Sequence, residues 1–301
     1  INALCSSNAM RCKCVGGNAL HYASSNQASL DVILLLLKKL PVEAAREKDR
    51  HGHTPLHLAC SNRATLNVVS LLLEYWPESI KETDENGYTS LHTACEYGAP
   101  LDIVSFLLDN WAGATKEKDN WGFTPLHTAC RYAASSDVVS FVLESWPDAL
   151  KEKTNYKITV LSMACQYAPL ETVVLLLDKW LGYKENRNIR GMMALKAYST
   201  IAPLEDVRKL FSQVNSLLFD KSIDKSTKRP IFCPNEIINY FLSIQLWNDV
   251  SLVIDVQPTV IKSMDLHTNV MAEFLSMTGR CCKLTTMWDV VRNEPDILED
   301  V

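Results

Sequence analysis

The chain has 301 residues, of which 47% are hydrophobic and 22% charged, and its net charge is -5. This composition is typical of a folded protein, and the mixing of acidic and basic residues offers no basic patch for nucleic acid. The apolar run Val32–Leu37 is far too short to cross a bilayer. We therefore expect neither nucleic-acid binding nor membrane insertion.

A short motif recurs along the first half of the chain. Its copies begin 35 or 36 residues apart: Asn18-Ala-Leu-His21, Thr54-Pro-Leu-His57, Thr89-Ser-Leu-His92, Thr124-Pro-Leu-His127 and the weaker Thr159-Val-Leu-Ser162. A second, leucine-rich motif ending near a tryptophan runs in step: Leu71–Pro77, Phe106–Trp111, Phe141–Pro147 and Leu175–Trp180. Self-similarity at a fixed period predicts a repeat architecture.

Each copy is typical of a helix, a turn, a second helix and a turn-rich connection. Thr54 is a good helix N-cap, and Pro55 then falls at the first helical position, where its missing N–H costs nothing. The spacing of apolar residues predicts a second helix over Leu66–Trp76, which Pro77 ends. A tight turn with positive φ is expected at Gly87.

The Thr-Pro-Leu-His-x-Ala motif, the helix hairpin and the projecting turn together resemble the ankyrin repeat. The resemblance is regular over residues 17–190 and implies an all-α solenoid, a curved stack whose turns and first helices line a concave face. Two features depart from the family. The period is 35 residues rather than about 33, and the glycine between the two helices is present at Gly98 but replaced by Arg63 and Ala133.

The chain from residue 191 to 301 carries more degenerate repeats. Met193–Lys196 with Leu204–Val214 is similar to a sixth unit, and a polar stretch over 220–234 interrupts the pattern. Asp249–Pro258 and Thr286–Pro295 each resemble a second helix. We expect one solenoid over residues 1–301 with about seven or eight units, the last ones forming a C-terminal cap.

The repeated histidines and cysteines are more consistent with structure than with chemistry. His57, His92 and His127 lie on successive repeats, too far apart to share one metal ion, and the resemblance implies that each bonds its own threonine. Four cysteines recur every 35 residues: Cys60, Cys95, Cys130 and Cys165. Repeats stack about 10 Å apart, beyond the reach of a disulfide, so these thiols should be buried and reduced.

The best metal candidate is an N-terminal cluster of residues with ligand side chains: Cys5, Cys12, Cys14 and His21. Its Cys-x-Cys spacing differs from the Cys-x₂₋₄-Cys of structural zinc sites. We interpret it as the remnant of a preceding repeat and expect no metal, no cofactor and no catalytic residue. A zinc-binding module at this end is the alternative.

Surface aromatic residues suggest where a partner would bind. Tyr97, Tyr132 and Tyr167 recur every 35 residues at a position that the ankyrin pattern leaves variable on the concave face, accompanied by Leu58, Thr93, Thr128 and Met163. The expected partner-binding residues are Tyr97, Tyr132, Tyr167, Trp121, Tyr156, Arg131, Glu96 and Arg50. A purely structural role, in which each tyrosine packs on its neighbour, is the alternative. Four periodic tryptophans should instead be largely covered: Trp76, Trp111, Trp146 and Trp180.

These features favour a protein-binding scaffold or adaptor that is not an enzyme. We expect a monomer in the cytoplasm whose partner is another protein, since the chain lacks N-x-Ser/Thr sequons and its cysteines follow the repeat. An alternative is that the chain is the targeting segment of a larger protein such as a kinase, a ubiquitin ligase or a channel.

Overall fold

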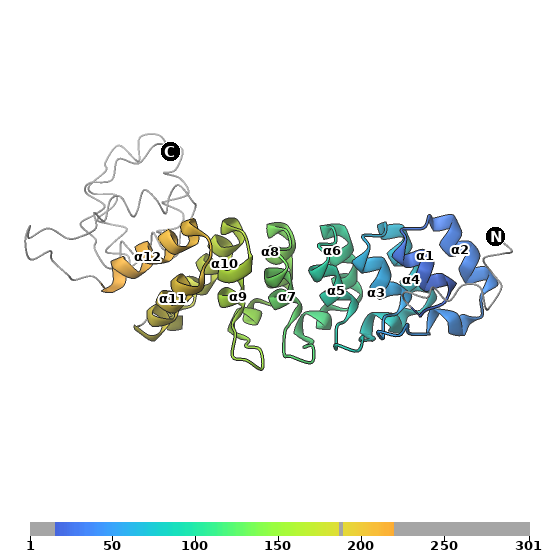
Figure 1. The fold of residues 1–301 in the computed structure, drawn as a ribbon, viewed down its shortest axis with the longest axis horizontal. Coiled ribbons are helices and arrows are strands. Elements are labelled where there is room, and N and C mark those ends of the chain that lie inside the picture. The colour runs from blue at the N-terminus through green and yellow to red at the C-terminus, as the bar shows by residue number, and fades with distance from the viewer. Residues whose placement is uncertain (1–15, 187–188, 220–301) are drawn as a thin grey trace, which may run out of the picture. The chain divides into compact units, whose positions relative to one another are not determined.

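The computed structural model describes residues 16–186 and 189–219 of the chain (Figure 1). Contacts between residues divide the chain into two compact units, residues 1–172 and 173–301. The described part consists of α-helices and short 3₁₀ helices, and no strand occurs in these ranges. The all-α fold class is therefore confirmed, whereas one continuous solenoid over residues 1–301 stays a prediction.

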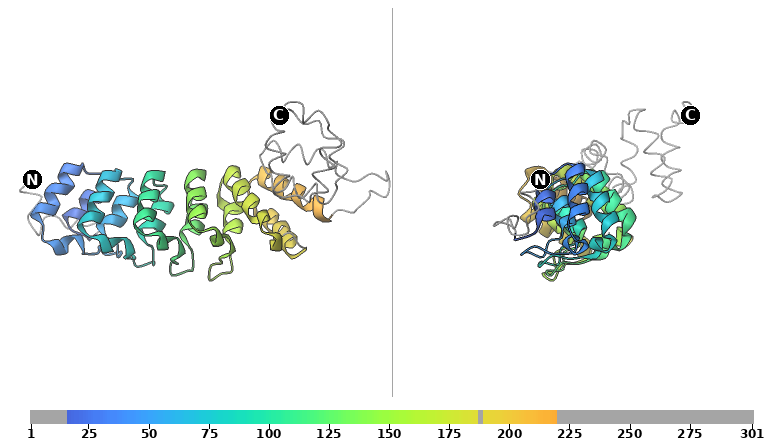
Figure 2. Two further views of the ribbon diagram at one scale, coloured as in Figure 1. Left: turned by 180° about the vertical axis from the view of Figure 1, so that it is seen from behind. Right: turned by 90° about the vertical axis from the view of Figure 1, so that its right-hand side faces the viewer.

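The first unit is a row of helix pairs (Figures 1 and 2). The first helices of the pairs are α1 (Ala19–Ser25), α3 (Pro55–Ser61), α5 (Ser90–Glu96), α7 (Pro125–Arg131) and α9 (Val160–Tyr167). The second helices are α2 (Leu30–Lys39), α4 (Leu66–Tyr75), α6 (Leu101–Asn110) and α8 (Ser136–Ser145). Each first helix packs on the next first helix, and each second helix on the next second helix, so the unit has two layers.

The first helices begin as the motif predicts. The Thr54 hydroxyl accepts a hydrogen bond from the His57 N–H, and the His57 ring accepts one from the Thr54 N–H, which closes a capping box. The His57 Nε2 lies 3.0 Å from the carbonyl oxygen of Tyr88 in the next repeat. A carbonyl can only accept, so Nε2 carries the proton and the histidine links two repeats. His92 makes the same bond to Phe123.

The turn between the two helices adopts positive φ in the first four repeats, whereas Ala168 after α9 is extended. Gly98 has φ +63°, and the residues that replace glycine also adopt this conformation: Gln27 at 52°, Arg63 at 53° and Ala133 at 52°. Two of the replacements form compensating hydrogen bonds to the next repeat. Gln27 Nε2 donates to the Asn62 carbonyl, and Arg63 Nε donates to the Tyr97 carbonyl. Ala133 has no such side chain.

Helices α4, α6 and α8 end just before a tryptophan, as expected, whereas α2 ends before Leu40 and α10 (Leu170–Gly182) continues past Trp180. The connection that follows is not irregular, however, but starts with a 3₁₀ helix: η1 (Val42–Ala45), η2 (Pro77–Lys81), η3 (Ala112–Lys116) and η4 (Pro147–Lys151). Ile80 and Leu150 are buried by these short helices. Trp76 is also buried, but Trp111, Trp146 and Trp180 are half-buried, so the expected covering is complete at Trp76 alone of the four.

Four projecting turns, called fingers here, follow the 3₁₀ helices and comprise residues 49–53, 84–88, 119–123 and 154–158. In the first three, an aspartate closes the turn by accepting two backbone N–H groups through Oδ1, as Asp84 does from Asn86 and Tyr88. Backbone hydrogen bonds of 3.0 Å then connect each finger to the next, from Glu85 to His51 and from Asn120 to Asn86. The fingers therefore form a connected row.

The glycine predicted for the tight turn is present in three fingers at φ of about 80°. A side chain on Gly87 would also clash with the backbone of Asn120 in the next finger, at 2.9 Å from its nitrogen. The fourth finger has Lys157 at φ 64° instead. Positive φ and close packing between fingers together explain why glycine is used in the first three.

The core of the first unit lies between the two helix layers. The periodic cysteines of this core are all buried and free, as predicted: Cys60, Cys95, Cys130 and Cys165. Leu56, Leu91 and Leu126 are at most 1% exposed at one repeated position. Burial of these side chains supplies most of the favourable free energy of folding.

The second unit contains the helix pair predicted for residues 193–214. Helix α10 (Leu170–Gly182) begins at the end of the first unit and continues into the second, and η5 (Lys184–Asn186) follows it. Helices α11 (Ile189–Ile201) and α12 (Glu205–Phe219) pack against each other, and α12 buries Val207, Leu210 and Phe211. The units predicted over 249–258 and 286–295, and the polar stretch 220–234, lie outside the described residues, so the number of repeats is not confirmed.

Candidate functional site

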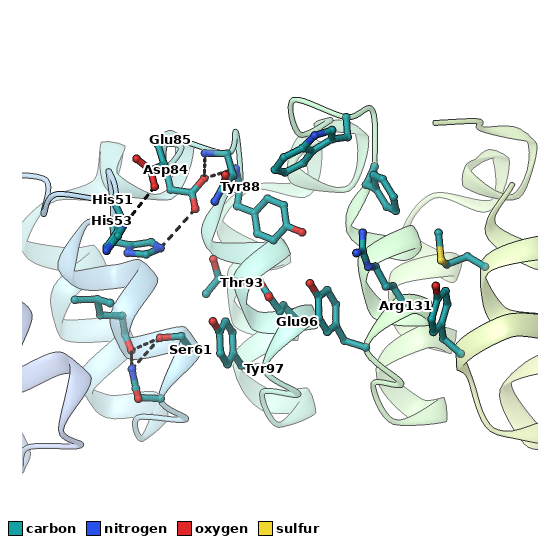
Figure 3. Close-up of a pocket in the computed structure, with 18 of the residues that line it drawn as sticks. His51, His53, Ser61, Asp84, Glu85, Tyr88, Thr93, Glu96, Tyr97 and Arg131 are labelled. Carbon is teal, nitrogen blue, oxygen red and sulfur yellow. Dashed lines mark hydrogen bonds and ion pairs between the residues drawn. The ribbon is translucent and has the colours of Figure 1, made fainter. Parts of the chain in front are cut away.

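An open groove of about 970 Å³ lies along the first unit, between the ends of the first helices and the fingers (Figure 3). It extends from Ser25 to Tyr167 and therefore spans several repeats. The following predicted partner-binding residues line it: Tyr97, Tyr132, Tyr167, Trp121, Tyr156, Arg131 and Glu96. Arg50 does not line the groove; it lies at the first finger, where its Nε is 3.0 Å from the His51 ring.

The aromatic residues of the groove are exposed. Tyr97 and Tyr167 are each 50% exposed and Tyr132 is 42% exposed, while the finger residues Trp121 and Tyr156 are 40% and 65% exposed. The backbone explains the row of tyrosines. Tyr97 and Tyr132 are the C-cap residues of α5 and α7, and Tyr167 ends α9, so each lies where a first helix stops.

The residues expected to accompany the tyrosines on the surface are not exposed, which corrects that part of the sequence analysis. Leu58, Thr93, Thr128 and Met163 are at most 7% exposed. They lie within the first helices, one turn before the tyrosines, where adjacent helices cover them. Leu58, Thr93 and Met163 still line the groove, as part of its base.

Two histidines at the first finger form an ionic network that the sequence analysis did not identify (Figure 3). His51 Nδ1 lies 3.1 Å from a Glu85 carboxylate oxygen. His53 lies between two carboxylates, with Nδ1 3.2 Å from Asp49 and Nε2 3.5 Å from Asp84. The His51–Glu85 and His53–Asp84 pairs join residues about one repeat apart, and no local motif would have indicated them.

The network shifts the pKa values of its members. The hydrogen bond to Asp84 raises the pKa of His53, against the effect of its partial burial, and the Asp49 carboxylate raises it further. Burial alone would raise the pKa of Asp84, but hydrogen bonds from His53 and from two backbone N–H groups bring it below its usual value. When His53 is protonated, it links the first and second fingers electrostatically.

Glu96 and Arg131 lie in the middle of the groove (Figure 3). The Arg131 guanidinium stands 5.3 Å from the Phe123 ring centre and 5.6 Å from that of Tyr132, which is cation–π geometry. Partial burial raises the pKa of Glu96, although the Tyr132 hydroxyl bonds to its carboxylate. The groove thus combines aromatic rings with charges of both signs.

The repeated histidines and cysteines are poorly suited to catalysis. Burial lowers the pKa of His57 and of His92 to about 4, so both rings are neutral near pH 7. Burial raises the pKa of the Cys60 and Cys95 thiols to about 12, so neither is a thiolate. A neutral, fully bonded imidazole and a buried thiol supply neither a general base nor a nucleophile.

One residue of the N-terminal zinc candidate, His21, is hydrogen-bonded within the helical repeats. His21 is buried at the position of the other motif histidines, where its Nδ1 accepts a hydrogen bond from the Asn18 N–H at 3.2 Å and its Nε2 lies 3.1 Å from the His53 carbonyl. Both ring nitrogens are thus engaged, which leaves none for a metal ion. Cys5, Cys12 and Cys14 lie outside the described residues, and no group of metal-binding side chains occurs within the described part.

Comparison with known proteins identifies the family. A model of the family "Ankyrin repeats (3 copies)" matches residues 1–84, 20–120 and 77–155, which together span just over half of the chain. The chain therefore belongs to the ankyrin-repeat family, as its motifs and stacked helix pairs indicate. No curated protein matches the chain.

Ankyrin repeats are generally protein-interaction modules and typically have no enzymatic activity of their own. The chain is accordingly built from units that bind other proteins. Among the described residues, no helix is both long enough and apolar enough to span a membrane.

Proposed function

We propose that this chain is an adaptor that binds a segment of another protein in the groove of its first unit and performs no catalysis. The distribution of exposed aromatic side chains carries the proposal. Apart from Tyr22, the tyrosine and tryptophan side chains that are exposed in the described part of the chain all line this groove. Exposed aromatic residues gathered on one concave surface are typical of a binding site.

The chemistry of these rings suits an anchoring role. A tyrosine or tryptophan buries a large area while only two side-chain torsions become fixed, so little entropy opposes binding. Neighbouring repeats place the rings in a row, which an extended protein segment can follow across several units. The binding residues are proposed to be Tyr97, Tyr132, Tyr167, Trp121, Tyr156, Arg131 and Glu96, with Arg50 at the edge.

The proposal includes an intracellular, cytoplasmic location. The four periodic cysteines are free and buried, and a fold that uses thiols as small core residues is stable without disulfides. We also propose that the chain is a monomer.

The test is a substitution at the centre of the tyrosine row. Tyr132→Ala should weaken partner binding by about 2 kcal/mol, because the exposed ring is lost from the interface. The melting temperature should change little, since 42% of the side chain is already exposed. Partners are captured from a cell lysate with the parent chain, identified by mass spectrometry and then titrated against each variant.

Tyr22→Ala is the matched control, because Tyr22 is 45% exposed on α1 but does not line the groove. It should leave binding unchanged. A triple variant that replaces Tyr97, Tyr132 and Tyr167 by alanine should lose the captured partners. If the triple variant remains folded and retains every partner, the groove is not the binding site. If the variants instead lose stability at unchanged affinity, the tyrosines are structural.

A further inference from the structure

The acidic residues that line the groove differ in whether a basic side chain lies within ion-pair distance. Glu85 pairs with His51 at 3.1 Å, and Asp84 pairs with His53 at 3.5 Å. Glu96, in contrast, forms no ion pair with any residue in the described part of the chain. It is the acidic side chain of the groove that lacks a basic partner.

Glu96 is held in a partly buried environment beside aromatic rings. It is the last residue of α5 and directly precedes the exposed Tyr97, and its carboxylate bonds to the Tyr132 hydroxyl. Figure 3 shows its side chain pointing into the groove below Tyr88. Burial raises the pKa of Glu96, because it makes the charged carboxylate less favourable, and the charges of Arg131 and His53 offset this only in part.

The nearest basic candidate in the groove is engaged elsewhere. The Arg131 guanidinium stands over the rings of Phe123 and Tyr132, and no nitrogen of it lies within ion-pair distance of Glu96. Its positive charge lowers the Glu96 pKa only as a minor, longer-range effect. An incoming cation would therefore not have to displace an existing salt bridge.

We infer that the segment bound in the groove carries a lysine or arginine side chain that enters beside Tyr97 and Tyr132 and pairs with the Glu96 carboxylate. This inference rests on the proposed function. A basic side chain would form a charge-assisted hydrogen bond with Glu96 and lie against the neighbouring rings, two favourable contacts that reinforce each other. A neutral or acidic side chain at this point would bury the Glu96 carboxylate without a positive charge beside it, which would weaken binding.

The experiment uses a display library of random peptides as the probe, selected separately on the full parent chain and on two variants. Glu96→Gln removes the charge and keeps the size, whereas Glu74→Gln is the control, since Glu74 is exposed on α4 away from the groove. Peptides selected on the parent and on Glu74→Gln should be enriched in Lys or Arg at one position. This enrichment should disappear on Glu96→Gln.

A second measurement assigns the effect to the pair of charges. One selected peptide is synthesised with its basic residue and again with norleucine, an uncharged side chain of similar length, and both are titrated by calorimetry. Glu96→Gln should weaken the basic peptide by about tenfold or more, as expected for a partly buried charge pair, and should leave the norleucine peptide nearly unchanged.

Two results would overturn the inference while leaving the proposed function intact: selected peptides without basic enrichment, or an equal loss of both synthetic peptides on Glu96→Gln. A parent chain that selects no peptide contradicts the proposed function itself, and the inference with it. Circular dichroism of each variant verifies that the helical fold is retained.

Discussion

The buried histidines connect the repeats, and they also make the stability of the fold sensitive to acid. His57 and His92 each bond a carbonyl of the following repeat, and burial lowers their pKa to about 4. The unfolded chain has histidines with the ordinary pKa of about 6.5 and therefore takes up protons first as the pH falls. The contribution of these histidines to the stability of the fold should be fully present above pH 6.5 and should decline from there toward pH 4.

This decline is testable through one histidine. Each such residue contributes up to about 3 kcal/mol of this loss, since one pKa unit corresponds to about 1.4 kcal/mol. His92→Ser, which copies Ser162 of the last regular repeat, should lower stability at pH 7.5 but flatten its dependence on pH between 6.5 and 4.5. Denaturant midpoints at several pH values give the dependence of stability on pH for the parent chain and for His92→Ser. An equal dependence in both would contradict the assignment of this decline to the buried histidines.

His53 acts in the opposite direction. Its pKa is raised by Asp84 and Asp49, so its stabilising contribution is fully present below pH 6.5 and is lost as the pH rises through the raised pKa. His57, His92 and His127 all have lowered pKa values. We therefore expect the loss of stability that these three histidines cause below pH 6.5 to exceed the effect of His53.

Position 98 isolates the cost of positive φ. Gly98→Ala should destabilise by about 1 kcal/mol, because alanine resists the left-handed region that this turn needs. Packing adds little, since an added Cβ would meet only the flexible end of Arg63, at 3.3 Å. Ala133→Gly, at the same point of the next repeat with φ 52°, should be stabilising by a smaller amount.

Chemical denaturation of both variants supplies the comparison. Opposite signs at equivalent positions would verify that backbone conformation, rather than side-chain contact, determines the residue there. A stabilising Gly98→Ala would refute this account.

At the scale of the elements, the aspartates at the base of the fingers are the critical polar residues. Asp84→Ala should destabilise by about 2 kcal/mol, because it leaves the buried Tyr88 N–H without its acceptor and His53 with only one of its two carboxylates, that of Asp49. Asp109→Ala is the control: Asp109 is exposed near the end of α6, and its removal should change stability by less than about 0.5 kcal/mol. Thermal melts of the two variants should differ clearly; similar melts would mean that the finger is held by its backbone bonds alone.

The helices of the first unit were predictable because their signals are local. Thr54 and Pro55 specify a helix start, and the apolar spacing up to Trp76 specifies the second helix. The 3₁₀ helices were missed, because Pro77 marks an end of the α-helix but does not show that Ile80 will be buried. That burial depends on contacts with other elements, which sequence spacing does not reveal.

The candidate site was predictable to a similar degree. The repeat places Tyr97, Tyr132 and Tyr167 on one side, because an identical offset gives an identical position in each unit. The pairing of His53 with Asp84 was not accessible, since it depends on how closely one finger stacks on the next. Nor did spacing show that Arg50 would lie outside the groove while its neighbour His51 lines it.

At the scale of the molecule, the main interactions among residues 16–172 lie within a repeat or join neighbouring repeats. Helices pack on the previous and next pair, fingers bond to the adjacent finger, and ion pairs such as Lys48–Glu82 and Lys118–Glu152 also join neighbours. Exposed ion pairs of this kind contribute little. Stability should therefore be distributed along the unit, as a sum over repeats and their interfaces.

A chain that ends after Glu152 tests this distribution. It keeps every helix from α1 to α8 together with η4, and it retains the Lys118–Glu152 pair. It loses the packing of α9 on α7 and the hydrogen bond from Asn155 to Trp121. We expect a folded helical protein with a lower melting temperature and a cooperative transition, measured by circular dichroism. A chain that ends instead at Val138, inside α8, should be far less stable, because α7 then lacks its second helix. If the chain ending at Glu152 shows no cooperative melt, stability depends on contacts beyond neighbouring repeats, and the additive description of the first unit fails.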